Sequence, residues 1–185
     1  MIYVIAVVVL LLLLTIGLYN SLVRRKNDVE NAFASIDAML KKRYDLLPNL
    51  LETVKSYMKH EKSLLNELTE LRTKAVSGEI SNNEKVEIEN KIVKGMSGLM
   101  VAVENYPDLK ASQNFLQLQG AWNEVEEQIS ASRRAFNAAV TSYNNKVETF
   151  PSNIMAGLMG YKRRALFEIP DVERRNLNAR NLFNQ

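Results

Sequence analysis

An uncharged N-terminal run constrains this chain more than any other feature. From Ile2 to Val23 no side chain is charged, and polar groups are few. An α-helix of this length rises about 33 Å, close to the roughly 30 Å hydrocarbon core of a bilayer. Tyr3 and Tyr19 fall near its two ends, where amphipathic rings prefer to sit among the headgroups. The sequence therefore predicts one transmembrane anchor over residues 1–23.

A cleaved secretory signal is the alternative interpretation of this run. Such a signal needs a basic segment before the apolar core and small residues at the cleavage site. Nothing basic precedes the run, and Gly17-Leu18-Tyr19 is a poor cleavage site. A lipoprotein signal would need a cysteine, and the chain has none. An uncleaved anchor is therefore favoured.

The charges next to the run predict its orientation. Arg24, Arg25 and Lys26 follow it at once, and basic residues beside a span tend to stay in the cytoplasm. We expect a single-pass protein of the cell (inner) membrane, with the N-terminus outside and residues 24–185 in the cytoplasm. The same three charges can attract anionic lipid headgroups, at about 1 kcal/mol each.

Charge along the rest of the chain argues against nucleic acid as a partner. Residues 27–160 hold 15 basic and 18 acidic side chains, and residues 161–185 hold 6 and 3. A nucleic-acid-binding domain would gather its basic residues into a dominant patch.

The soluble part has the periodicity of long amphipathic helices and no strand signals of consequence. Apolar residues recur every three or four positions over 27–76, with Pro48 as the one internal breaker, and a kink there is favoured over a reversal. Ser81 with Glu84 predicts a capping box that opens a second helix. A third helix is expected from an Asp108 N-cap to Glu148. Its seam has a heptad spacing: Phe115, Trp122, Ile129, Phe136, Tyr143 and Phe150.

These helices predict an all-α body over residues 24–168, followed by a polar, basic tail over 169–185 that we expect to be disordered. A first helix of some 50 residues would be far longer than the second, so three rods cannot simply stack. Splitting the first helix at Pro48, or adding a short fourth helix after Pro151, would each solve this. The residues alone leave both solutions open.

Few residues could carry catalysis. The single histidine, His60, rules out histidine triads and multi-histidine zinc sites, and the seven glycines form no phosphate-binding loop. A carboxylate-based enzyme stays possible, but no pair of carboxylates is marked over another. We therefore predict no enzymatic activity, no catalytic residue, no metal, no cofactor and no small-molecule substrate.

Two sets of residues stand out as candidate sites. Four polar residues interrupt the apolar seams and form a candidate ion network: Arg43, Asp45, Glu126 and Arg133. A network that fixes helix register is favoured over a binding or switching site. The apolar and basic segment after Pro151, with the cluster that follows the span, is the candidate lipid or partner contact: Arg24, Arg25, Lys26, Ile154, Met155, Leu158, Met159, Lys162, Arg163, Arg164 and Phe167. For the segment after Pro151, two interpretations are equally favoured. It either docks to a membrane surface or partner, or it packs on the bundle.

Three blocks of the sequence resemble the LemA family. They read RKNDVENAFASIDAMLKKRYDLLPNLLETVKSYMKHE from Arg25, ENYPDLKASQNFLQLQ from Glu104, and SRRAFNAAVTSYNNKVETFPSN from Ser132. The resemblance covers nearly the whole chain. Phe33 and Phe136 stand where the family usually has tryptophan and tyrosine, which affects packing details only. The resemblance implies a cytoplasmic, antiparallel four-helix up-and-down bundle on one anchor, without catalytic residues. Some relatives take part in building magnetosome membranes, and others look associated with membrane-protein quality control.

Together these features predict a non-enzymatic, membrane-anchored helical scaffold. Its expected partners are membrane lipid and either further copies of itself or other membrane proteins. A protein that remodels the membrane surface by binding anionic lipid through residues 150–168 is the alternative, and a carboxylate-based enzyme is the least favoured.

Overall fold

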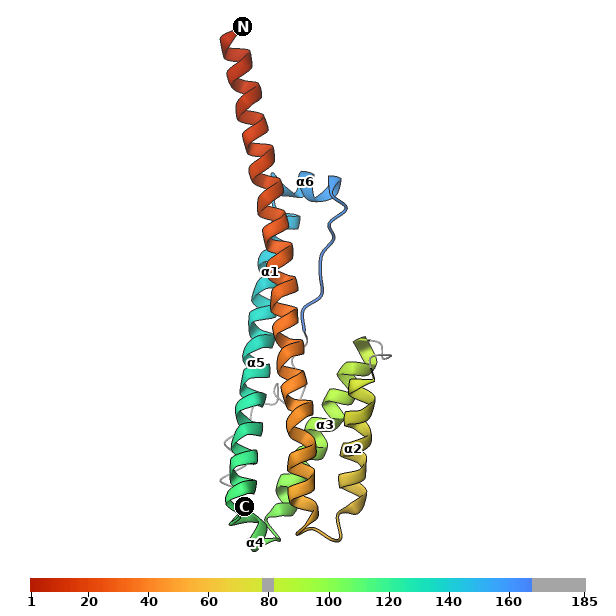
Figure 1. The fold of residues 1–185 in the computed structure, drawn as a ribbon. Coiled ribbons are helices and arrows are strands. Elements are labelled where there is room, and N and C mark those ends of the chain that lie inside the picture. The colour runs from red at the N-terminus through yellow and green to blue at the C-terminus, as the bar shows by residue number, and fades with distance from the viewer. Residues whose placement is uncertain (78–81, 168–185) are drawn as a thin grey trace, which may run out of the picture. The chain divides into compact units, whose positions relative to one another are not determined.

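The computed structural model describes residues 1–77 and 82–167. Within these ranges every regular element is a helix, as predicted (Figure 1). The elements are α1 (Ile2–Lys55), α2 (Lys62–Val76), α3 (Asn82–Val103), α4 (Pro107–Lys110), α5 (Gln113–Glu148) and α6 (Ser152–Leu158).

The chain forms two compact units. The first unit comprises residues 1–34 and 132–185, and the second comprises residues 35–131. Helices α1 and α5 each run through both units, so each unit contains one part of both helices. The arrangement of four helices in one antiparallel bundle remains a prediction.

The second unit has a core of large aliphatic and aromatic side chains from five helices. Leu50 and Val54 of α1, Leu68 of α2, Leu99 of α3 and Leu109 of α4 are fully buried, and Phe115 of α5 is 1% exposed. A side chain at Gly95 would place its Cβ 2.8 Å from the Leu68 Cδ2 atom. Glycine at this position therefore allows α3 to pack closely on α2.

Pro48 neither reverses the chain nor ends α1. Proline has no N–H, so the carbonyl four residues earlier, that of Tyr44, loses its usual helical donor. Arg72 of α2 replaces that donor, since its Nε donates to the Tyr44 carbonyl oxygen at 3.3 Å. This bond from a neighbouring helix lets the helix pass through the proline.

The helix predicted over 27–76 is interrupted, because α1 ends at Lys55 and α2 begins only at Lys62. The chain turns between α1 and α2, where both Tyr57 N–H and Met58 N–H donate to the Val54 carbonyl. Met58 is 1% exposed in this turn, and Glu61 at its end accepts a hydrogen bond from the Tyr106 hydroxyl at 2.7 Å. Burial of Met58 and this side-chain contact stabilise a turn that has no glycine.

The third predicted helix is divided in two. Asp108 lies within the first turn of the short helix α4, and α5 begins afterwards at Gln113. Five of the six heptad positions are buried as predicted: Phe115, Trp122, Ile129, Phe136 and Tyr143. The sixth, Phe150, is 80% exposed because α5 ends at Glu148. Ser81 and the tail beyond Phe167 lie outside the described residues.

Candidate functional site

The N-terminal part of α1 presents a continuous apolar surface. The large aliphatic side chains from Ile2 to Ile16 are between 49% and 78% exposed, and the ring of Tyr3 is 84% exposed. Burial starts only at Leu22, which is fully buried. Among the described residues, α1 is the one helix long and apolar enough to cross a membrane. Uncharged surface of this size is stable in lipid and unfavourable in water.

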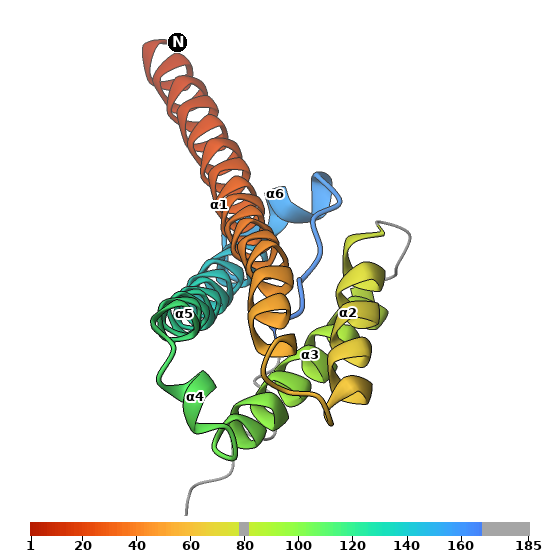
Figure 2. The same ribbon diagram turned by 60° about the horizontal axis from the view of Figure 1, so that its bottom comes forward.

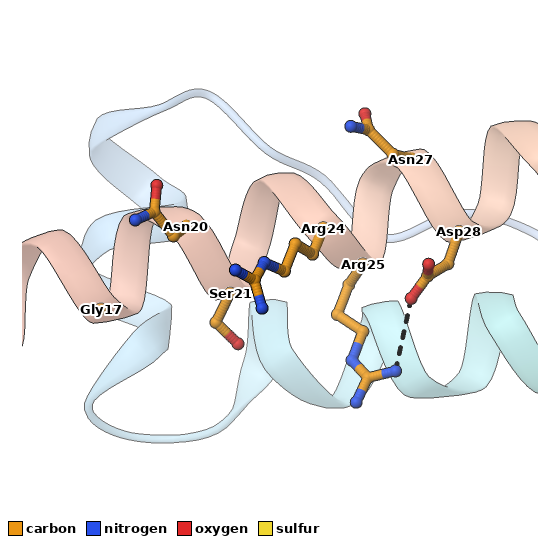
Figure 3. Close-up of a pocket in the computed structure, with 7 residues that line it drawn as sticks. All are labelled: Gly17, Asn20, Ser21, Arg24, Arg25, Asn27 and Asp28. Carbon is orange, nitrogen blue, oxygen red and sulfur yellow. Dashed lines mark hydrogen bonds and ion pairs between the residues drawn. The ribbon is translucent and has the colours of Figure 1, made fainter.

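A polar band follows directly. Figure 3 shows the residues that line a shallow depression on this stretch of α1: Gly17, Asn20, Ser21, Arg24, Arg25, Asn27 and Asp28. Arg25 Nη1 lies 3.4 Å from Asp28 Oδ2, and Lys26 Nζ lies 3.6 Å from Glu30 Oε1. The candidate contacts Arg24 and Arg25 are exposed and Lys26 is half-buried. The helix therefore changes from apolar to charged within about one turn.

Residues 159–167, which we call the strap, follow α6 and pack along α5 in the first unit. Two asparagines of α5 hold its backbone. Asn144 Nδ2 donates to the Arg164 carbonyl at 2.9 Å, and Arg164 N–H donates to Asn144 Oδ1 at 2.9 Å. Asn137 makes the same pair of bonds with Phe167, at 3.0 and 2.8 Å. Each of these side-chain amides thus gives the strap one donor and one acceptor, as a neighbouring β-strand would.

Aromatic and charged side chains add to the contact between strap and helices. Phe167 meets the ring of Phe136 edge-on at 5.1 Å, and Phe136 meets Phe33 of α1 at 6.0 Å. The Arg164 guanidinium lies 5.3 Å above the ring of Tyr143 and 3.4 Å from a carboxylate oxygen of Glu30. The strap is therefore packed on the helices of its unit.

The candidate contact segment divides into two parts. Arg164 and Phe167 are half-buried in the packing just described, whereas Lys162 and Arg163 are exposed. In α6, Ile154 is 60% and Leu158 80% exposed. Met155 and Met159 are half-buried. The strap therefore packs on the helices of the first unit, whereas α6 leaves large apolar side chains exposed.

A buried ion cluster occupies the second unit. The Arg43 guanidinium, 1% exposed, forms an ion pair with Glu89 of α3 and lies 2.6 Å from Glu126 Oε1 of α5. Its Cζ also lies 5.8 Å from the ring centre of Trp122. Tyr44 donates its hydroxyl hydrogen to Glu89 Oε1, and burial raises the pKa of Tyr44. One cation thus joins helices α1, α3 and α5.

The structure brings together two of the four residues in the predicted network. Arg43 and Glu126 are paired, Asp45 is exposed, and Arg133 belongs to the first unit. Sequence reasoning missed Glu89. Its position, three residues after Val86 and three before Ile92, lies on the inward face of the second predicted helix, and this spacing could have identified it.

Fold and site together define a class: a membrane-associated, all-helical protein with one candidate membrane-spanning helix and a buried arginine–glutamate cluster in its second unit. The LemA family model matches residues 32–180, and the chain belongs to the LemA family. It is 30% identical to Protein LemA of Metamycoplasma hominis, over 95% of this chain and 84% of that protein.

More distant relatives are magnetosome proteins. The chain is 23% identical to Magnetosome protein MamQ 2 of Paramagnetospirillum magneticum, over 81% of this chain and 64% of that protein. It is 22% identical to Magnetosome protein MamQ of Magnetospirillum gryphiswaldense, over 80% of this chain and 64% of that protein. The chain thus spans less than two thirds of the length of these magnetosome relatives.

Proposed function

We propose that this protein is a non-enzymatic scaffold that is tethered to the inner membrane, with its N-terminus outside and its helical body in the cytoplasm. One observation carries the proposal. The uncharged, exposed residues 2–17 continue without a break into the part of α1 that packs in the first unit. A movement of the first unit therefore involves the spanning helix itself.

The mechanism is confinement to two dimensions. An anchored body meets neighbouring membrane proteins at a far higher effective concentration than a freely diffusing one. The second unit offers a surface for such encounters on α3, where Val93 is 42% and Val101 72% exposed. These two residues are eight positions apart, so their side chains point about 80° apart around the helix, within one broad face. We assign this side of α3 to contacts with other membrane proteins or with a second copy of the chain.

The magnetosome names of the distant relatives support a role in membrane organisation. Support of membrane-protein quality control is the other role that fits a tethered scaffold. An enzyme would need a concave site with carboxylates of perturbed pKa. The two carboxylates that the structure gathers around Arg43 are neutralised in part by that arginine, which favours a structural role.

Site-specific crosslinking tests the scaffold proposal. Because the chain has no cysteine, Val93→Cys and Val101→Cys each introduce a single attachment point for a photoactivatable crosslinker. Glu67→Cys, at an exposed polar position on α2, is the matched control. In intact cells we expect discrete adducts from α3 and few from α2. If none of the three positions gave a crosslinked adduct with another chain, that result would contradict the scaffold proposal.

A second candidate function is binding of anionic lipid through residues 150–168. It is favoured by the exposed Ile154 and Leu158 of α6, which lie near the exposed cations Lys162 and Arg163 in the sequence.

A further inference from the structure

Helix α6 exposes the side that a helix in water would bury. Ile154 and Leu158 are four residues apart, so they lie along one side, and they are 60% and 80% exposed. Phe150, just before the helix, is 80% exposed. The opposite side holds Ser152 and Ala156, which are 3% and 1% exposed. A surface helix of a soluble domain buries its large apolar residues and exposes its serines. The pattern in α6 is the reverse and fits a helix whose outer surroundings are apolar.

The position of α6 indicates which apolar surroundings these are. In Figures 1 and 2, α6 lies beside α1 and across its axis, and Figure 3 shows ribbon of the C-terminal segment next to the stretch from Gly17 to Ser21. In this stretch the exposed apolar residues of α1 give way to the polar band that begins with Arg24. Helix α6 therefore lies beside α1 near the point where the surface that α1 offers to lipid ends.

The charges near α6 fit an anionic surface. The side chain of Arg163 is 71% exposed, and Lys162 beside it is also exposed. Arg24 and Arg25 add two exposed cations in the same unit. Basic residues flanking an apolar helical side are typical of helices that lie in the membrane interface.

We propose that α6 is a second membrane contact, lying in the plane of the cytoplasmic leaflet. Phe150, Ile154 and Leu158 enter the boundary between headgroups and acyl chains, and Lys162 and Arg163 contact anionic headgroups. The inference rests on the proposed span of α1. Because the strap fixes α6 to α5, this contact sets the depth and rotation of the first unit, which a single spanning helix leaves free.

Depth-dependent quenching tests the proposal on the full chain. Ile154→Cys and Leu158→Cys, labelled with an environment-sensitive fluorophore, are reconstituted in liposomes of mixed zwitterionic and anionic phospholipid. Val8→Cys reports on the spanning segment, and Glu67→Cys, at an exposed polar position on α2 in the second unit, is the control for exposure to water. Phospholipid with a nitroxide near the headgroup is the quencher, because an interfacial helix lies about 5–10 Å into this boundary.

We expect a blue-shifted emission and quenching by the nitroxide lipid at Ile154 and Leu158, and neither at Glu67. Quenching at Val8 without quenching at Ile154 and Leu158 would overturn the inference and leave the span intact. Accessibility of Val8 to an aqueous quencher would overturn the span itself. Crosslinking of Ile154 or Leu158 to a second copy, with no lipid quenching, would show that the side is an interface between chains and would also overturn the inference.

Discussion

Arg43 holds a full charge in an almost completely buried position, and its stability depends on two carboxylates. Removing one partner of a buried pair leaves an uncompensated charge, which typically costs about 3–5 kcal/mol. We therefore expect Glu89→Ala to lower the free energy of unfolding by about that amount. Thermal unfolding of the full chain in detergent, followed by circular dichroism, measures it.

The control for this substitution is Glu104→Ala. Glu104 pairs with Lys110, and both side chains are more than half exposed, so its loss should change stability by about 0–1 kcal/mol. The double variant Arg43→Met with Glu89→Met removes both charges and should be more stable than Glu89→Ala. Equal unfolding temperatures for Glu89→Ala and Glu104→Ala would show that the cluster contributes little.

Tyr44 makes the second unit sensitive to alkaline pH. Burial raises its pKa above the ordinary value of 10.0, while Arg43 lowers it and Asp37 raises it further. The folded state thus binds the phenolic proton more tightly than the unfolded chain. The resulting stability is fully present below about pH 10 and is lost as pH rises through the raised pKa.

We expect Tyr44→Phe to lose less stability than the unaltered chain between about pH 8 and about pH 11. Part of the loss will remain, because burial also raises the pKa of Tyr143 and the hydrogen bond to Glu61 raises that of Tyr106. Melting temperatures at the two pH values measure the difference. Tyr57→Phe is the control at a 40% exposed tyrosine, and an effect of the same size there would refute the assignment to Tyr44.

At the residue scale, periodicity predicted most of the core but not its polar partners. The heptad of the third predicted helix identified five buried aromatic and aliphatic residues of α5, and it placed Glu126 near the core. The pairing of Arg43 with Glu89 could not be read from spacing, because it depends on how α3 packs beside α1. The bond from Arg72 to the Tyr44 carbonyl, which accommodates Pro48, is likewise a tertiary contact.

At the element scale, the asparagine clamps on the strap can be tested by proteolysis. Asn144→Ala removes two hydrogen bonds, worth about 1 kcal/mol each, so the strap should open about 30-fold more often. Trypsin cuts after the exposed Lys162 and Arg163, and cleavage follows the open population when closing is fast. We expect a rate increase of about this size at these sites, measured by mass spectrometry.

Asn145→Ala is the matched control for the clamp. Asn145 is the next residue of α5 and its side chain is exposed, so its removal should leave the cleavage rate unchanged. Equal rates for Asn144→Ala and Asn145→Ala would mean that the aromatic contacts of Phe167 hold the strap without the amide clamp.

Element boundaries were the weakest part of the sequence prediction, for a physical reason. Turn residues such as glycine and proline are local signals, but α1 ends at Lys55 and the chain turns through residues that include neither. The turn is stabilised by burial of Met58 and by the bond from Tyr106 to Glu61, which is 45 residues away in sequence. The existence of long helices is a local property of the sequence, whereas the residue at which each ends depended here on distant contacts.

At the scale of the whole molecule, orientation in the membrane depends on a small number of charges. Arg24, Arg25 and Lys26 are the basic residues next to the apolar run, and residues before it carry none. Replacing all three by Gln removes the nearest bias that holds the following domain in the cytoplasm. We expect a mixture of both orientations, measured with C-terminal reporters that are active on one side of the membrane only.

A control set separates this local effect from a general loss of positive charge. Lys55→Gln, Lys59→Gln and Lys62→Gln remove the same number of charges far beyond the span, where basic residues have little influence on insertion. This variant should keep the orientation of the unaltered chain. The two results together also bear on α6, because its cations and apolar side reach the cytoplasmic leaflet only when Arg24 faces the cytoplasm. A C-terminal reporter that is active outside in the unaltered chain would therefore remove both the proposed topology and the proposed contact of α6 with the cytoplasmic leaflet.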